Sequence, residues 1–84
     1  MSASNLTPKR EKLILEAFDA IHALGVLHCD VRTQNILIGK NDQVWIIDFE
    51  FSLKVEQNAK REDRFAEERE HVVQLLTDVR TNKP

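Results

Sequence analysis

The chain is poor in the residues that cross-link proteins and cradle phosphates. Cys29 is its one cysteine, so no intramolecular disulfide can form, and a reducing intracellular setting is the default expectation. Only two glycines occur, Gly25 and Gly39, and they stand far apart in the sequence. This spacing excludes a glycine-rich loop that could fold over the phosphates of a nucleotide.

Long apolar runs and a strong excess of one charge are missing as well. Nowhere do about eighteen apolar residues follow one another, and charged side chains interrupt the N-terminal part, so we expect neither a membrane span nor a signal peptide. The formal net charge is −2 and the pI is about 5.9, which gives no general attraction to nucleic acid or to anionic membranes. We therefore expect a cytoplasmic protein with neither kind of partner.

The chain does contain enough apolar sequence for one small domain. Apolar residues make up 42% of its 84 residues, close to the average of globular proteins, which argues against wholesale disorder. A domain of this size buries only about 60% of the surface that the unfolded chain exposes, so its stability should be marginal. We expect a single domain over residues 1–84.

Hydrophobic periodicity predicts two amphipathic helices. Thr7 and Pro8 are typical of a helix start, and Gly25 is typical of the residue that ends a helix, so the first helix should cover about residues 8 to 24. The second helix is expected over about residues 61 to 80, from the helical spacing of its apolar positions, Phe65, Val72, Val73, Leu76 and Val79.

A β-hairpin is expected between the two helices. Residues 36–38 and 44–47 are β-branched and aromatic, and the Gly-Lys-Asn-Asp sequence between them favours a turn. Both strands are almost entirely apolar, which indicates cover on both faces. From Phe51 to about Lys60 the chain is polar, and nothing predicts a regular structure there. The expected fold class is therefore α+β.

Most of the functional information lies in two short segments. One is His-Cys-Asp-Val-Arg-Thr-Gln-Asn at residues 28–35, and the other is Val-Trp-Ile-Ile-Asp-Phe at residues 44–49. They place Asp30 in a polar loop, Asn35 at the end of that loop and Asp48 after an apolar strand. Two carboxylates and an amide in such an arrangement suit a hard divalent cation, a polyphosphate and a hydroxyl that must lose its proton.

These segments resemble the catalytic loop of protein kinases, H-x-D-x-x-x-x-N, and the metal-binding D-F-G that follows it. Every fixed position is met except the last, where Glu50 replaces glycine. The chain is similar to part of a kinase C-terminal lobe over about residues 10 to 80, closest to fungal protein kinase-like proteins. The resemblance implies a partial C-terminal lobe in which two amphipathic helices flank the catalytic loop and a short hairpin.

The resemblance also implies roles for individual residues. Asp30 would be the catalytic base, and Asn35 and Asp48 would bind Mg²⁺ and, through it, ATP. Arg32 stands where kinases often carry a lysine that touches the transferred phosphate, and a planar guanidinium can bind phosphate oxygens in two places. His28 is expected to be architectural. Cys29 replaces the arginine that normally pairs with a phosphorylated activation loop, which argues against that mode of control.

Other polar residues are assigned to the structural background. His22 has no ligand partners at metal spacing and should lie at the surface or at a boundary, and Cys29 has no base that would make it a nucleophile. The acidic run at residues 67–70 should be a solvated helix face, and Trp45 a core or half-buried strand residue. Taken singly, an asparagine such as Asn35 often caps a turn. The agreement of residue types and spacing favours the functional interpretation.

Two hypotheses about activity stay open. A complete kinase has two lobes and roughly 250 residues, and no strand lysine of the V-A-I-K type can be assigned in this sequence. The chain is either a phosphotransferase module that needs a partner protein to supply the missing lobe, or a non-catalytic pseudokinase remnant that acts as an interaction module. Catalysis by the chain alone is not expected.

Overall fold

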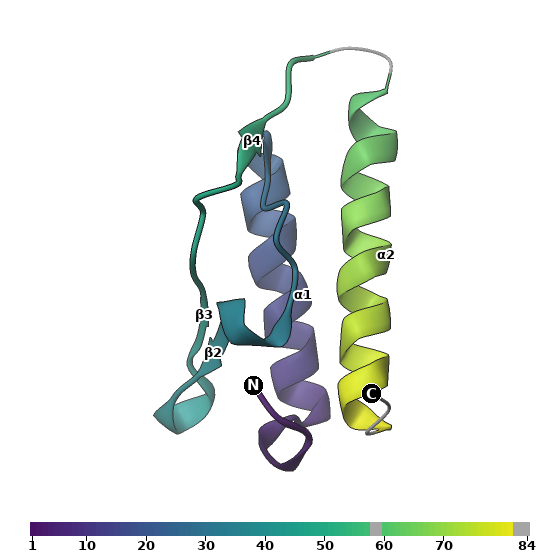
Figure 1. The fold of residues 1–84 in the computed structure, drawn as a ribbon. Helices are drawn as coiled ribbons and strands as arrows, with labels where there is room; N and C mark the ends of the chain where they lie inside the picture. Colours follow the sequence, from purple (N-terminus) through teal and green to yellow (C-terminus); the bar gives the residue numbers. More distant parts are fainter. Residues whose placement is uncertain (58–59, 82–84) are drawn as a thin grey trace.

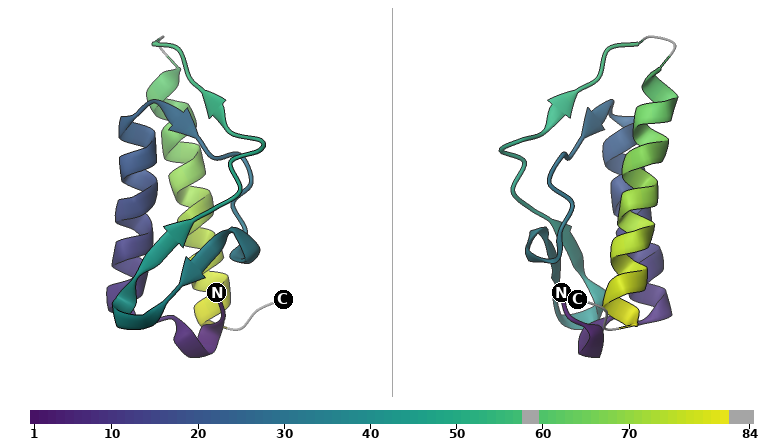
Figure 2. Two further views of the ribbon diagram at one scale, coloured as in Figure 1. Left: turned by 90° about the vertical axis from the view of Figure 1, so that its left-hand side faces the viewer. Right: turned by 45° about the vertical axis from the view of Figure 1, so that its right-hand side comes forward.

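The computed structural model describes residues 1–57 and 60–81. Two helices, α1 (Pro8–Ala23) and α2 (Arg61–Arg80), lie side by side, and a layer of short strands and loops covers one side of the pair (Figures 1 and 2). Within the described residues, no helix is both long and apolar enough to cross a membrane.

The first helix begins and ends where the sequence predicts. The Thr7 hydroxyl accepts a hydrogen bond from the backbone N–H of Arg10 at 3.2 Å, and Pro8 is the first helical residue. Gly25 follows the helix end with a φ of +81°, a left-handed conformation that glycine adopts without strain. The prediction of a helix over about residues 8 to 24 is confirmed to within one residue, and α2 coincides with the second predicted helix.

The main core lies between the two helices and the strand layer. Ile14 and Phe18 are almost completely buried one turn apart on α1, and Val72 and Leu76 repeat this spacing on α2. The cluster is completed by two buried residues from the intervening chain, Val31 and Ile36. The apolar stripes read from the sequence therefore face each other, as amphipathic helices require.

The predicted hairpin is present. β2 (Ile36–Ile38) pairs antiparallel with β3 (Val44–Ile46), with Leu37 opposite Trp45. The indole of Trp45 lies over Gly39, where a Cβ atom would come 2.5 Å from the ring, so a larger residue here would require the ring to move. Of the two faces expected to be covered, α1 covers the inner one, and the described residues leave the outer one open. Leu37 and Trp45 stay 42% and 48% exposed on the outer face, which confirms Trp45 as half-buried.

A second small sheet was not predicted. β1 (Val26–Leu27) pairs antiparallel with β4 (Leu53–Lys54), inside the stretch of residues 51–60 where no regular structure was expected. Two-residue strands are too short to show a period in the sequence. The next residue, Val55, is buried, and its backbone N–H donates to the carbonyl of Gly25 at 2.8 Å. The part of that expectation that concerns residues 58–59 lies outside the described residues.

The two-helix core should dominate the stability of the chain. Ile14→Ala removes a fully buried side chain and should lower the free energy of unfolding by about 2–5 kcal/mol. Leu24→Ala is the matched control, because Leu24 is 76% exposed and its truncation should change stability by less than about 0.5 kcal/mol. Urea denaturation followed by circular dichroism measures both, and equal shifts would contradict this description of the core.

Candidate functional site

Three of the predicted site residues contact one another in the loop between β1 and β2. The side-chain amide of Asn35 donates to the backbone carbonyl of Asp30 at 2.8 Å and to its carboxylate at 3.0 Å. Nε of Arg32 lies 3.3 Å from the other carboxylate oxygen of Asp30. Asn35 is buried, and the Asp30 side chain is 20% exposed, so the carboxylate is held in place while still open to solvent.

The orientation of Asn35 has a chemical consequence. Its amide nitrogen makes both bonds to Asp30, and the amide oxygen, the atom that can coordinate a cation, takes part in neither. Arg32 is 57% exposed, and an exposed ion pair contributes at most about 1 kcal/mol, so its guanidinium can leave Asp30 at little cost. An amide oxygen and a movable guanidinium beside a fixed carboxylate suit a metal-bound phosphate.

The segment that carries Asp48 is joined to the loop by backbone hydrogen bonds of the preceding residue, Ile47. The N–H of Ile47 donates to the carbonyl of Asn35 at 2.9 Å, and the carbonyl of Ile47 accepts from Nε2 of His28 at 2.8 Å. Asp48 itself is exposed and has a φ of +61°, a conformation that aspartate tolerates better than most residues. Among the described residues, no hydrogen bond or ion pair joins its carboxylate to Asp30 or Asn35.

The residues fit a magnesium ion in ligand type. Asn35 offers an amide oxygen and Asp48 a carboxylate, the hard oxygen ligands that Mg²⁺ prefers, and water can fill its other positions. Within residues 1–57 and 60–81, no group of three or more histidine, cysteine, aspartate or glutamate side chains is placed to hold a metal ion. The expected ligands are Asn35 and Asp48, and only Asp48 is one of these four residue types. This absence therefore does not test the expected site, and metal binding stays a prediction.

His28 is the structural link between the loop and the segment of Asp48. Its side chain is completely buried, Nδ1 accepts from the backbone N–H of Asp30 at 3.2 Å, and Nε2 donates to the carbonyl of Ile47. These bonds assign the proton to Nε2 and so favour a neutral ring. The ring meets Phe18 and Phe49 edge-on, with centroids 6.0 and 4.8 Å apart. This geometry supports the architectural role expected of His28.

Glu68 of α2 anchors the loop, and sequence reasoning missed it. Its two carboxylate oxygens accept the backbone N–H groups of His28 and Cys29, both at 2.9 Å, and one of them also accepts from Nε2 of His22 at 2.8 Å. The Glu68 and His22 side chains are each only 8% exposed. Cys29 has a φ of +69°, so the carboxylate holds the backbone where it adopts a left-handed conformation.

The charge of Glu68 is stabilised by these bonds. Burial alone raises the pKa of this carboxyl group, but the hydrogen bonds from His22 and from the N–H groups of Cys29 and His28 outweigh it and hold the pKa below its usual range. Burial and the nearby charge of Glu68 raise the pKa of the Cys29 thiol, with Arg64 acting in the opposite direction. The thiol is therefore a poor nucleophile, in line with the sequence-based expectation.

Two background assignments are thus wrong. His22 is buried rather than at a surface, and the run at residues 67–70 is not a purely solvated face, because Glu68 points inward. Helical spacing carried a signal for both. Glu68 lies three residues after Phe65 and four before Val72, and His22 continues the four-residue spacing of the buried positions on α1.

Comparisons with known proteins agree with this arrangement. A family profile described as "Protein kinase domain" matches residues 5–73, which include the loop, both small sheets and the part of α2 that carries Glu68. The chain belongs to the protein kinase domain family. The resemblance read from the two motifs is confirmed, and the structure is a small mixed helix-and-sheet part of such a domain.

Individual kinases match over short stretches of their length. The serine/threonine-protein kinase SKS1 of Saccharomyces cerevisiae is 39% identical over 41 residues, which cover 49% of this chain and 8% of that protein. PknH of Mycobacterium tuberculosis is 48% identical over 48 residues (52% and 8%), and kin-29 of Caenorhabditis elegans is 40% identical over 50 residues (60% and 6%). The kinase-domain chain therefore spans less than a tenth of these relatives. No solved structure matches it.

Replacing the loop anchor should loosen the loop. Glu68→Gln keeps the size of the side chain but removes its charge and turns an N–H₂ group toward backbone N–H donors, so the free energy of unfolding should fall by about 1.5–3 kcal/mol. The amides of His28 and Cys29 should exchange with solvent faster, as hydrogen-exchange NMR would show. Glu67→Gln is the matched control, because Glu67 is the exposed neighbour. Equal effects of the two changes would contradict the anchor.

The lowered pKa of Glu68 predicts a pH dependence with a definite sign. A carboxyl group with a depressed folded-state pKa contributes stability above its unfolded pKa of about 4.3 and loses it as the pH falls through the folded value. The stability difference between the native chain and Glu68→Gln should be present at about pH 5.5 and should shrink as the pH falls below about 4.3. Urea titrations at several pH values measure it, and a gap that widens in acid would disprove the assignment.

Proposed function

We propose that the chain is a kinase-type phosphotransferase module that binds MgATP at the loop and needs a partner protein to act. The observation that carries the proposal is the bond from the Asn35 amide to both the backbone and the carboxylate of Asp30. This bond holds the carboxylate proposed as the base close to an amide oxygen that can coordinate a cation, which supports phosphoryl transfer. Ile47 ties the segment of Asp48 to the same loop.

Each residue has a defined task in this proposal. The carboxylate of Asp30 orients the acceptor hydroxyl and takes its proton, and the guanidinium of Arg32 moves from Asp30 to oxygens of the transferred phosphoryl group. Asn35 and Asp48 would hold Mg²⁺, which neutralises charge on the phosphates when bound. The printed names of the relatives support a serine or threonine hydroxyl as the acceptor.

An exposed apolar strip supports the need for a partner. Leu37 and Trp45 lie opposite each other on the outer face of the hairpin, and the chain that follows exposes Ile47, Phe49 and Phe51 by 36%, 41% and 61%. Large side chains left in water next to a polar site are typical of a protein interface. A nucleotide-binding lobe would cover this strip and supply the phosphate loop and the lysine that this sequence lacks.

A non-catalytic interaction module is the second candidate. Glu50 is exposed two residues after Asp48, where it adds negative charge close to the expected position of the phosphates. The same apolar strip would then bind a partner without chemistry. The two candidates differ in whether the chain binds MgATP.

Binding of MgATP should stabilise the fold, because a ligand that binds only the native state shifts the unfolding equilibrium. At about one hundred times its dissociation constant it adds roughly 2.7 kcal/mol, which is a rise of several degrees in the midpoint for a domain of this size. Thermal melts with MgATP should show this rise in the native chain and lose it in Asp48→Asn.

Asp63→Asn on α2 is the control, because it removes an exposed carboxylate far along the chain from the loop. It should keep the full rise. A native chain that shows no rise, or an Asp48→Asn variant that keeps it, would leave the interaction module as the supported function.

A further inference from the structure

The outer face of the hairpin is an open apolar surface. Leu37 and Trp45 lie opposite each other, and the ladder continues to Ile47, whose N–H donates to the carbonyl of Asn35. Because side chains alternate along a strand, Ile47 lies on the same face as Trp45, and all three apolar side chains are more than a third exposed. The surface runs from the hairpin turn to the chain that leaves β3 (Figure 2).

The turn at one end of this surface is positively charged. Lys40 is exposed, and its side chain has no hydrogen bond or ion pair among the described residues. The carboxylate of the turn, Asp42, is already paired with two cations of α1. Its oxygens lie 3.2 Å from Nζ of Lys9 and 2.8 Å from Nε of Arg10. Three cations around one carboxylate leave this end with a net charge of +2.

The other end of the surface is negatively charged. Asp48 and Glu50 are exposed, and neither side chain is paired within the part of the chain that the structure describes. The ion pair of Asp30 with Arg32 in the adjoining loop adds no net charge. The next cation along the chain, Lys54, belongs to the other small sheet. The apolar surface therefore separates two ends of opposite charge.

We propose that a second copy of this chain docks on this face in antiparallel orientation. A two-fold interface places the same patch of both copies together, so the apolar centres meet and each positive end lies against the negative end of the other copy. Lys40 of one copy then pairs with Glu50 of the second, and this contact occurs twice in the dimer. Trp45 stands midway between them in the sequence, close to the two-fold axis, where tryptophan is a typical anchor of an interface.

The charge pattern favours this occupant and this orientation. A face with charges of a single sign would repel its own copy and would fit a partner of the opposite sign. A face with one positive and one negative end fits its own copy, and only in the antiparallel orientation. In the parallel orientation like charges would meet, which disfavours that alternative.

The dimer would also regulate the proposed site, a consequence that rests on the proposed function. Asp48, a proposed metal ligand, lies two residues from Glu50, so Lys40 of the second copy would compete with a cation there. A nucleotide-binding lobe and a second copy would use the same apolar strip, and each would exclude the other. Self-association would therefore keep the chain inactive until a lobe displaces the second copy.

Sedimentation equilibrium at constant ionic strength, at about pH 7 and without nucleotide, tests the dimer. The mass of the native chain should rise from 9.7 kDa toward twice that value between about 5 and about 500 μM. Lys40→Glu and Glu50→Lys should each weaken the dimer about tenfold, because each change turns two attractions into repulsions. The double variant exchanges the charges of both ends and should restore the native affinity to within about twofold.

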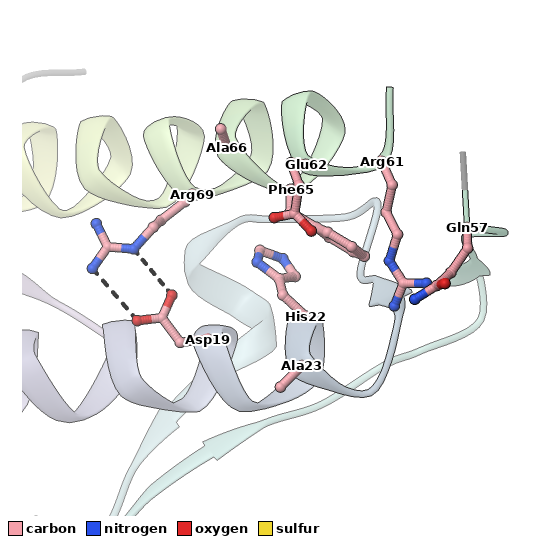
Figure 3. Close-up of a pocket in the computed structure, with 9 residues that line it drawn as sticks. All are labelled: Asp19, His22, Ala23, Gln57, Arg61, Glu62, Phe65, Ala66 and Arg69. Atoms are coloured by element: carbon pink, nitrogen blue, oxygen red, sulfur yellow. Dashed lines mark hydrogen bonds and ion pairs between the residues drawn. The ribbon is translucent and has the colours of Figure 1, made fainter. Parts of the chain in front are cut away.

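Glu62→Lys is the matched control for Glu50→Lys. Glu62 is an exposed glutamate that lines a cavity of about 410 Å³ between α1 and α2, and no residue of the hairpin lines this cavity (Figure 3). Either change brings the formal net charge from −2 to 0, which in itself promotes association. Glu62→Lys should therefore dimerise at least as well as the native chain, whereas Glu50→Lys should dimerise less.

Three results would overturn the proposal: a mass that stays at 9.7 kDa over this range, equal affinities of Glu50→Lys and Glu62→Lys, or a double variant no tighter than the single ones. None of these readouts uses a nucleotide. Failure here would therefore leave MgATP binding untouched, and failure to bind MgATP would leave the dimer untouched.

Discussion

The carboxylate of Glu68 is the contact on which the rest of the site depends. The loop after β1 bends sharply at Cys29, and the bend turns two backbone N–H groups toward α2. Without an acceptor, a buried donor such as the N–H of His28 would cost about 1–3 kcal/mol. One buried carboxylate satisfies both and is itself held by His22, so the second helix fixes the loop as well as completing the core.

From this anchor a closed set of hydrogen bonds reaches the residues of the proposed chemistry. The backbone of His28 is held by Glu68, and its ring holds both the N–H of Asp30 and the carbonyl of Ile47. The N–H of Ile47 donates to the carbonyl of Asn35, and the side-chain amide of Asn35 donates to the carbonyl of Asp30. The catalytic loop and the segment of Asp48 are thereby joined by hydrogen bonds.

The sequence predicts what is periodic or patterned, and it fails where tertiary contacts decide. Both helices and the hairpin follow from apolar spacing and helix-end residues, and the family follows from the spacing of Asp30, Asn35 and Asp48. The pairing of β1 with β4 has no local signal, since two residues show no period. Glu68 was assigned to solvent because its neighbours are charged, although its spacing from buried residues placed it on the inner face. The outer face of the hairpin has the apolar composition of a core, yet no part of the chain that the structure describes covers it.

In the proposed function, Asn35 and Asp48 converge on one hard cation beside Asp30. Mn²⁺ replaces Mg²⁺ at oxygen-ligand sites, and its unpaired electrons broaden the NMR signals of nearby nuclei. With ATP present, Mn²⁺ should broaden the backbone signals of Asn35, Asp48 and their neighbours before any others. Broadening centred on other carboxylates, or none around the loop, would contradict the account.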